Sequence, residues 1–425
     1  MEGTRSWLDN LKLRFSVGTL GNGNVDPYKF LPTMSIDKTG VIVGDGQVNY
    51  TSYPGLIPNN LTWEKVTTYD VGVDVDMFKN RLTIGFDWYR RNTTDMYTVG
   101  PTLPEVLGTT QPKGNYADLK TKGWELTLSW RDNFKLAGSD FHYGVKLMLW
   151  DSQSWITKYN NATGKLSDYY EGYRIGDIWG YNIEGLFTSY DEIANHADQD
   201  YMKISDSKIW QPGDLKFADL NGDGKIDKGA QTLSDHGDLV IVGNEEERYH
   251  YGFNLNVGWK GIGISAFFQG VGKRDWYPGQ ETGFFWGKYN RPYGYSLKMH
   301  ENRWTEENPN PNAYWPRLVG YSSENGGRPM GTPNNRYMQD ASYLRLKALT
   351  VDYSLPQAWV SKLGLTGLKI YFTGENLFTF SNVCENFDPE VIKGGDVDLK
   401  DRKGEEQGYS YPMLKTYTVG LNVSF

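Results

Sequence analysis

The segment Tyr69-Asp-Val-Gly-Val-Asp-Val-Asp-Met77, with Phe78-Lys-Asn-Arg81 and Leu82-Thr-Ile-Gly-Phe-Asp-Trp88 after it, decides the fold class. Every second residue on either side of the short turn is apolar or aromatic, which predicts a hairpin of two strands. The opposite face of this hairpin carries four aspartates, namely Asp70, Asp74, Asp76 and Asp87. Carboxylates cannot line a dry core without partners, so this face needs water while the apolar face needs cover.

The last fifteen residues, Tyr411 to Phe425, show the same alternation from Tyr417 onward and end on an apolar position. Two kinds of cover are possible for such faces, the core of a β-sandwich or the hydrocarbon of a membrane. Similar stripes recur along the chain and predict roughly eleven strands of about ten residues, the length that a tilted bilayer crossing needs. These stripes are Leu11–Val17, Trp124–Trp130, Phe141–Leu149, Tyr249–Trp259, Ile262–Phe268, Leu349–Tyr353, Leu368–Phe372 and Tyr417–Phe425.

The composition agrees with a membrane barrel. Aromatic residues make up 15% of the 425 residues and there are 49 glycines, yet the chain holds no apolar run long enough for a spanning helix. The net charge of −8 comes with no basic patch, so we expect no nucleic acid partner. The single Cys384 excludes an internal disulfide and a cysteine zinc site, and residues 1–7 do not form a secretory signal.

The spacing of the strands favours a barrel over a sandwich. Very short turns alternate with long excursions, as in outer-membrane barrels, and aromatic residues such as Trp88, Trp124 and Trp259 stand at the ends of the stripes. A soluble glycan-binding β-sandwich remains an alternative, although its strands are usually shorter. One excursion, about 155–247, is a loop insertion in which Ser189-Tyr-Asp-Glu192 predicts the start of a short helix.

This insertion contains a calcium-type loop from Asp219 to Asp227. Oxygen ligands stand at loop positions 1, 3, 5 and 9, the glycine at position 6 allows the turn, and position 7 offers its carbonyl. Position 12 is Ala230 where a bidentate carboxylate is expected, so Asp235 or Asp214 would have to close the shell. Both a structural Ca²⁺ site and a metal-free turn remain open; the predicted ligands are Asp219, Asn221, Asp223, Lys225 and Asp227.

A later excursion is rich in aromatic residues beside arginine and asparagine. Such faces suit carbohydrate or peptide ligands, through stacking and hydrogen bonds, but they also serve to pack long loops on one another. Both interpretations stay open for Trp276, Tyr277, Trp286, Tyr289, Arg291, Trp304 and Trp315. The five histidines are scattered and no nucleophile, phosphate or dinucleotide motif occurs, so we expect neither an enzyme nor a cofactor site other than calcium.

Several segments together resemble the SusC/RagA family of TonB-dependent outer-membrane transporters, and the resemblance covers essentially the whole chain. They are Asn10–Asn22, Trp63–Lys65, Asp219–Asp227, Gly252–Gly270, Arg303–Thr305, Ser342–Lys347, Gly374–Phe378 and the terminal Phe425. The resemblance implies an all-β, antiparallel transmembrane barrel of 22 strands, of which residues 1–425 would be about the C-terminal half, without the plug domain and the TonB-contacting segment.

The resemblance also implies a function. The whole protein would import glycans, oligosaccharides or peptides across the bacterial outer membrane, driven by the TonB complex and assisted by a SusD-like surface lipoprotein acting as a lid. The aromatic loops would then line the ligand cavity or the lid contact. A plugless porin is the other membrane alternative, and the sequence does not name the substrate.

Overall fold

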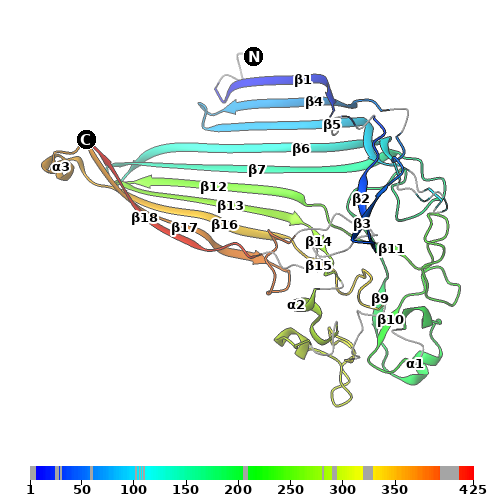
Figure 1. Ribbon diagram of the computed structural model, residues 1–425. Helices are drawn as coiled ribbons and strands as arrows, with labels where there is room; N and C mark the ends of the chain where they lie inside the picture. Colours follow the sequence, from blue (N-terminus) through cyan, green and yellow to red (C-terminus); the bar gives the residue numbers. More distant parts are fainter. Residues whose placement is uncertain are drawn as a thin grey trace.

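Ten strands form one antiparallel sheet in the computed structural model, and long loops gather at one end of it (Figure 1). The structure describes residues 6–23, 28, 31–57, 61–100, 103–104, 106, 108, 111–203, 209–279, 282–289, 294–318, 329–392 and 411–425. In spatial order the strands are β1 (Leu8–Asn22), β4 (Glu64–Met77), β5 (Leu82–Val99), β6 (Lys113–Leu136), β7 (Ser139–Lys158), β12 (Arg248–Trp259), β13 (Ile262–Lys273), β16 (Tyr343–Ser354), β17 (Gly367–Ser381) and β18 (Thr416–Ser424).

The order in space follows the order in sequence, as expected for an up-and-down wall. The predicted hairpin is β4 and β5, which pair from Met77↔Leu82 to Lys65↔Thr94. Their turn places Phe78, Lys79 and Asn80 in the left-handed region. The sheet stays open: among the described strands, β1 and β18 form its two edges.

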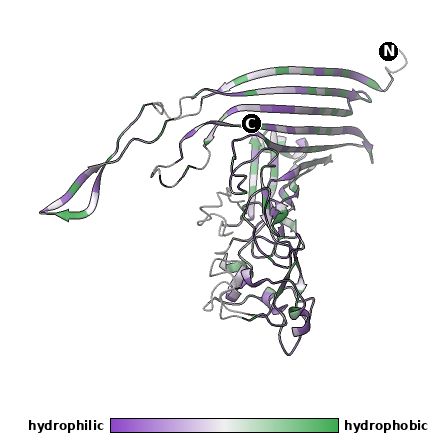
Figure 2. Ribbon diagram, turned by 90° about the vertical axis from the view of Figure 1, so that its right-hand side faces the viewer, coloured by the Kyte–Doolittle hydropathy of each residue, from purple (hydrophilic) through white to green (hydrophobic). Residues whose placement is uncertain are grey.

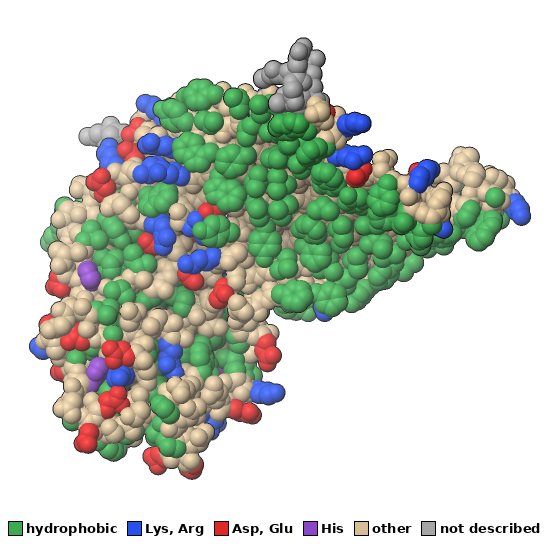
Figure 3. Space-filling view, turned by 180° about the vertical axis from the view of Figure 1, so that it is seen from behind, with side chains coloured by type: hydrophobic (Ala, Val, Ile, Leu, Met, Phe, Trp, Pro, Cys, Tyr) green, Lys and Arg blue, Asp and Glu red, His purple; other side chains and the backbone are tan. Residues whose placement is uncertain are grey.

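The register keeps the apolar stripes in line from strand to strand. Leu13 lies opposite Val73, Val73 opposite Phe86, and Phe86 opposite Leu126. Side chains of this face are exposed, with 73% of Phe15 and 74% of Val419 accessible. Figure 2 shows the alternation along the ribbons, and Figure 3 shows the apolar side chains as a continuous patch over the sheet.

This exposed apolar face excludes the β-sandwich alternative, since no second sheet among the described residues packs on it. A sandwich would bury the stripes between two layers. Here they are left for lipid, which agrees with the predicted membrane wall.

The opposite face of the sheet is polar and partly ion-paired. The Arg14 guanidinium of β1 lies 2.8 Å from Asp74 of β4 and 2.7 Å from Asp87 of β5. A methyl group at Gly72 would lie 2.2 Å from the Asp87 carboxylate, so glycine makes room for this network. The Asn10 amide donates to Asp76 at 3.2 Å, so three of the four predicted aspartates have partners on this polar wall.

The remaining elements lie mostly in the loops. The strand pairs are β2 (Ile36–Val43) with β3 (Gly46–Thr51), β8 (Asp177–Gly180) with β11 (Val240–Asn244), β9 (Ile183–Leu186) with β10 (Leu215–Phe217), and β14 (Asp275–Trp276) with β15 (Gln339–Asp340). The helices are α1 (Tyr190–Ala194), α2 (Gly283–Trp286) and α3 (Gln357–Val360), with 3₁₀ turns η3 (Asp200–Met202), η4 (Gly287–Tyr289), η5 (Lys298–Glu301) and η6 (Ser361–Leu363).

The predicted helix start is confirmed, because the Ser189 side chain accepts the Glu192 N–H at the beginning of α1. None of the helices in the described ranges is long and apolar enough to span a bilayer.

The two faces of β6 allow a paired test of the membrane assignment. Leu128 lies between Ile84 and Leu147 on the apolar face, whereas its neighbour Thr127 lies on the polar face opposite Gly85, where space is available. In the intact protein we predict that Leu128→Arg destabilises the barrel by about 2–4 kcal/mol, because arginine is costly at the bilayer midplane.

Thr127→Arg is the matched control and should change the unfolding free energy in lipid vesicles little. Equal effects of the two substitutions would contradict the assignment of the faces.

Candidate functional site

A loop assembly at one end of the sheet contains the hydrophobic core of this chain. Buried residues come from the 155–247 insertion, from the excursion between β13 and β16, and from the segment after β17. Ile183, Phe217 and Ile226 of the insertion belong to the same cluster as Trp286, Trp315 and Phe387. The three loops therefore pack as one unit.

The predicted aromatic residues lie inside this core. Trp286 and Trp315 are fully buried, and Trp276, Tyr277, Tyr289 and Trp304 are at most 8% exposed. The rings of Tyr289 and Trp315 are stacked with their centroids 5.1 Å apart, and the Trp315 ring is also stacked on that of Tyr337 with a centroid distance of 5.2 Å. Packing of the loops is thus the role that these six side chains have here, and direct contact with a ligand or lid stays a prediction. Arg291 lies outside the described residues.

Hydrogen bonds fix the polar atoms of these rings. The Trp286 indole N–H donates to the carbonyl of Gly279 at 2.9 Å, and that of Trp315 donates to Met299 at 3.0 Å. The Tyr289 hydroxyl donates to the carbonyl of Pro316 at 2.7 Å. Because these three buried donors have partners, the three rings hold the loop backbone in one arrangement.

The calcium-type loop is organised by its own backbone. The Asp219 carboxylate accepts the N–H groups of Gly222 and Gly224 at 2.7 and 2.9 Å, while the side chain of Ile226 is fully buried in the loop core. Asp223 accepts the N–H of Lys225 at 2.8 Å, and Asp227 accepts that of Gly229 at 2.7 Å. Each carboxylate therefore accepts backbone N–H groups two to five residues further along the chain.

Residues outside the motif brace this loop. Asp238, which the motif did not reveal, accepts the N–H groups of Leu220 at 2.8 Å and Asp227 at 2.9 Å. Asp235 accepts from Ala230 at 3.1 Å, and Asp214 is held 2.6 Å from the Arg317 guanidinium. Within the described ranges, no three His, Cys, Asp or Glu side chains converge as a metal site would require. The calcium site stays a prediction.

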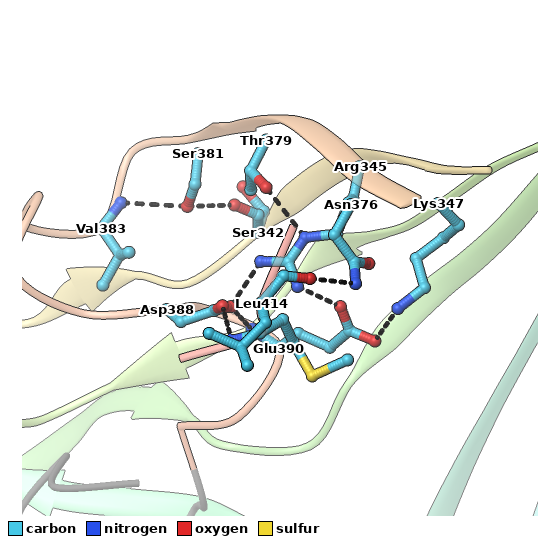
Figure 4. Close-up of polar contacts among 11 residues, drawn as sticks. Ser342, Arg345, Lys347, Asn376, Thr379, Ser381, Val383, Asp388, Glu390 and Leu414 are labelled. Carbon is cyan, nitrogen blue, oxygen red and sulfur yellow. Dashed lines mark hydrogen bonds and ion pairs between the residues drawn. The ribbon is translucent and has the colours of Figure 1, made fainter. Parts of the chain in front are cut away.

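A buried ion-pair network ties the last loop to the polar face of the sheet (Figure 4). Arg345 of β16, whose side chain is 3% exposed, lies 2.5 Å from both Asp388 and Glu390. Its Nε donates to the Thr379 hydroxyl of β17 at 2.8 Å, and Lys347 reaches the same Glu390 at 2.8 Å. We name these five residues the Arg345 network.

The Arg345 network also reaches the entry to the last strand. Asp388 accepts the backbone N–H of Met413 at 2.9 Å, and Asn376 donates to the carbonyl of Leu414 at 2.9 Å. Each oxygen of Asp388 thus holds a different segment, and the loop after β17 is fixed beside the polar wall.

A paired substitution tests the Arg345 network. We predict that Arg345→Ala frees residues 382–392, because removing one partner of a buried ion pair costs about 3–5 kcal/mol. Lys369→Ala is the control, since Lys369 pairs with Asp352 at 3.1 Å with 46% of its side chain exposed and should cost at most about 1 kcal/mol. Hydrogen exchange of residues 382–392 is measured in both variants and should accelerate only in Arg345→Ala. Equal protection of these residues in Arg345→Ala and in the unchanged protein would show that the Arg345 network does not hold the loop.

His300 gives the loop core a pH dependence. Its Nδ1 accepts the Leu297 N–H at 2.8 Å and its Nε2–H donates to the carbonyl of Phe285 at 2.8 Å, so protonation of Nδ1 would break the first contact and keep the second. Burial lowers the pKa of His300 below its ordinary value. A depressed histidine pKa means that the unfolded loop binds the proton first, so stability falls as the pH drops below about 6.5.

We therefore predict faster proteolysis within residues 294–318 at about pH 5 than at about pH 7.5, where the histidine is neutral in both states. His300→Gln should remove this difference. A difference that persists in His300→Gln would assign the effect to other groups.

Calcium binding is tested directly with the metal. We predict that Ca²⁺ slows hydrogen exchange of residues 219–230, because a bound cation would cross-link the carboxylates of the turn. Asp219→Asn with Asp223→Asn should abolish the effect, and unchanged exchange at millimolar Ca²⁺ would refute the site.

Comparison with known proteins finds similar barrels. The family described as TonB dependent receptor-like, beta-barrel matches residues 6–201. TonB-dependent receptor P3 of Formosa agariphila is 28% identical over 97% of this chain and 39% of its own length. TonB-dependent receptor SusC of Bacteroides thetaiotaomicron is 25% identical over 98% of this chain and 38% of its own length.

The fold also matches a solved structure. The RagAB peptide transporter superposes with a TM-score of 0.72 at 23% identity, covering 99% of this chain and 41% of that chain. The chain thus spans about two fifths of the length of the proteins that it matches. The exposed apolar stripes and the polar inner face agree with these comparisons: residues 6–201 match the β-barrel of TonB-dependent receptors, and the whole chain is similar to part of such receptors.

Proposed function

We propose that the chain forms part of the wall and external loops of a TonB-dependent importer for glycans, oligosaccharides or peptides. The observation that carries the proposal is the two-faced sheet, apolar outside and polar inside, in a chain that is similar to TonB-dependent receptors along its length. In this proposal the edges β1 and β18 are covered by further strands of the same barrel, because lipid does not tolerate unpaired backbone groups.

The polar inner wall suits passage of a hydrophilic cargo. A hollow of about 1020 Å³ lies against this wall at the end with the short turns. It is lined by amide, hydroxyl and cationic side chains, among them Thr127, Lys146 and Asn254. We infer that water contacts this surface in the intact protein. We assign no catalytic role to the chain.

The loop assembly is the proposed contact for the partner. A SusD-like surface lipoprotein would sit on the external loops as a lid, and the TonB complex would act through parts of the protein outside this chain. Because Trp315 is fully buried, the loop core would shape the lid contact from beneath rather than touch it. The support for this partner is the likeness to SusC and to RagAB.

Dependence on TonB separates an importer from the porin alternative. We predict that uptake of the cognate oligosaccharide or peptide by cells carrying the intact protein stops when TonB is deleted or the proton gradient is collapsed. Passive entry through a porin would continue in both cases, and continued uptake would refute the proposal.

A paired variant tests the loop assembly in the same cells. Trp315→Ala should lower uptake and lid binding, because loss of a buried tryptophan costs about 3–5 kcal/mol. Leu318→Ala, at a side chain that is 44% exposed, is the control. Normal uptake and lid binding in Trp315→Ala would contradict a role for the loop core.

A further inference from the structure

The outer face of the sheet carries a group of cations just beyond the apolar band. Trp88 of β5 lies opposite Trp124 of β6 at the end of the band. Two residues further along each strand, on the same face, Arg90 lies opposite Lys122, and the next such position on β6 is Lys120. We name Arg90, Lys120 and Lys122 the rim cations.

No carboxylate of the described residues lies within ion-pair distance of the rim cations. Like charges placed directly opposite each other on paired strands are destabilising. In the part of the chain that the structure describes, none of the three forms an ion pair, and the Arg90 guanidinium donates only to the Asn92 amide oxygen at 3.1 Å. Asp151, which lies opposite Trp124 on β7, is already held by Arg248 at 2.5 Å. An unpaired cationic group of this kind calls for an external anion.

A hollow of about 280 Å³ lies beside these cations. Lys120 and Lys122 line one side, and the Trp155 ring lies 5.8 Å from the Lys120 ammonium. Glu171 lines the hollow as well, so it faces two ammonium groups with a single carboxylate, and Arg90 adds a third cation next to Lys122. The net charge at the hollow is therefore positive; its other lining residues are Ile156, Thr157 and Gly172.

The position of the hollow relative to the membrane boundary indicates which ligand it would bind. Tryptophan side chains mark the boundary between hydrocarbon and headgroups, and cations just beyond that boundary meet lipid phosphates. Figure 3 shows Lys and Arg side chains gathered where the apolar patch gives way to the loops. We propose that the rim cations and the hollow bind the phosphorylated headgroup of an outer-leaflet lipid, whose acyl chains lie along the apolar stripes of β5, β6 and β7.

This arrangement favours a lipid over a dissolved anion. The cations continue directly from a face that contacts acyl chains, so a lipid places its phosphate there while its chains cover Trp88 and Trp124. The Trp155 ring offers an apolar surface within the hollow itself. A free phosphate would gain only the ionic contacts and would lose the acyl-chain contacts.

The experiment titrates the intact receptor in detergent with a bisphosphorylated lipid A, its dephosphorylated form and inorganic phosphate, and counts bound molecules by native mass spectrometry. The test variant is Arg90→Gln/Lys120→Gln/Lys122→Gln. Its matched control is Lys79→Gln/Lys135→Gln/Lys260→Gln, which removes three cations at the turns at the opposite end of the strands. Heat-dependent migration in gels verifies that both variants form a folded barrel.

We expect the unchanged protein and the control to retain the phosphorylated lipid, and the test variant to bind it on the order of tenfold to a hundredfold more weakly. The dephosphorylated lipid should bind all three proteins equally weakly. Equal retention of the phosphorylated lipid by the test variant would overturn the proposal. Inorganic phosphate that binds as tightly as the lipid would also overturn it, since the site would then recognise the dissolved anion.

Discussion

The structure depends on one constraint, that each strand of the wall meets two different solvents. Hydrocarbon on one side and water on the other force the side chains to alternate, and they leave the sheet as the only source of partners for the backbone. The register carries this alternation across all ten strands without changing face, from Leu13 through Val73 to Phe86 and beyond. Charged side chains are tolerated on the inner face because water reaches it. Neighbouring strands bring them close enough to pair, as Arg14 does with Asp74 and Asp87.

The loops follow a different rule, because water surrounds them and they must make their own core. They do so with large aromatic side chains, whose area is buried while their N–H and O–H groups reach backbone carbonyls. Buried ion pairs then fix the loops: Arg345 of β16 attaches the loop after β17 to the wall, and Arg317 joins its own loop to Asp214 in the insertion. Hydrophobic burial thus stabilises the interior of the loop assembly, and ion pairs hold the loops to the sheet and to one another.

Much of the wall could be predicted from sequence because its signal is local. Each stripe is read from neighbours two residues apart, and the prediction of roughly eleven strands is close to the ten strands that the described residues form. The Ser189 cap is equally local and is confirmed. The whole chain also resembled its family closely enough to name the barrel.

The loop contacts could not be predicted in this way, because their partners are distant in sequence. Trp315 packs on Phe285 and Tyr337, and Arg345 meets Asp388 in a separate loop, so no spacing rule reports these contacts. Sequence patterns likewise gave no sign that Asp238 braces the Asp219 turn. The sequence contains the rim cations, but only the pairing of β5 with β6 shows that Arg90 and Lys122 lie opposite each other.

The separate core of the loop assembly has a consequence for the energetics of the whole receptor. Two bodies in two solvents, one stabilised by lipid and backbone pairing and one by aromatic packing in water, are distinct cooperative units. A single melting temperature therefore does not describe the protein, because denaturant can unfold the loops while the strands of the wall stay folded in the bilayer. Substitutions inside the loop core can therefore change the stability of the loops without changing the packing of the barrel strands.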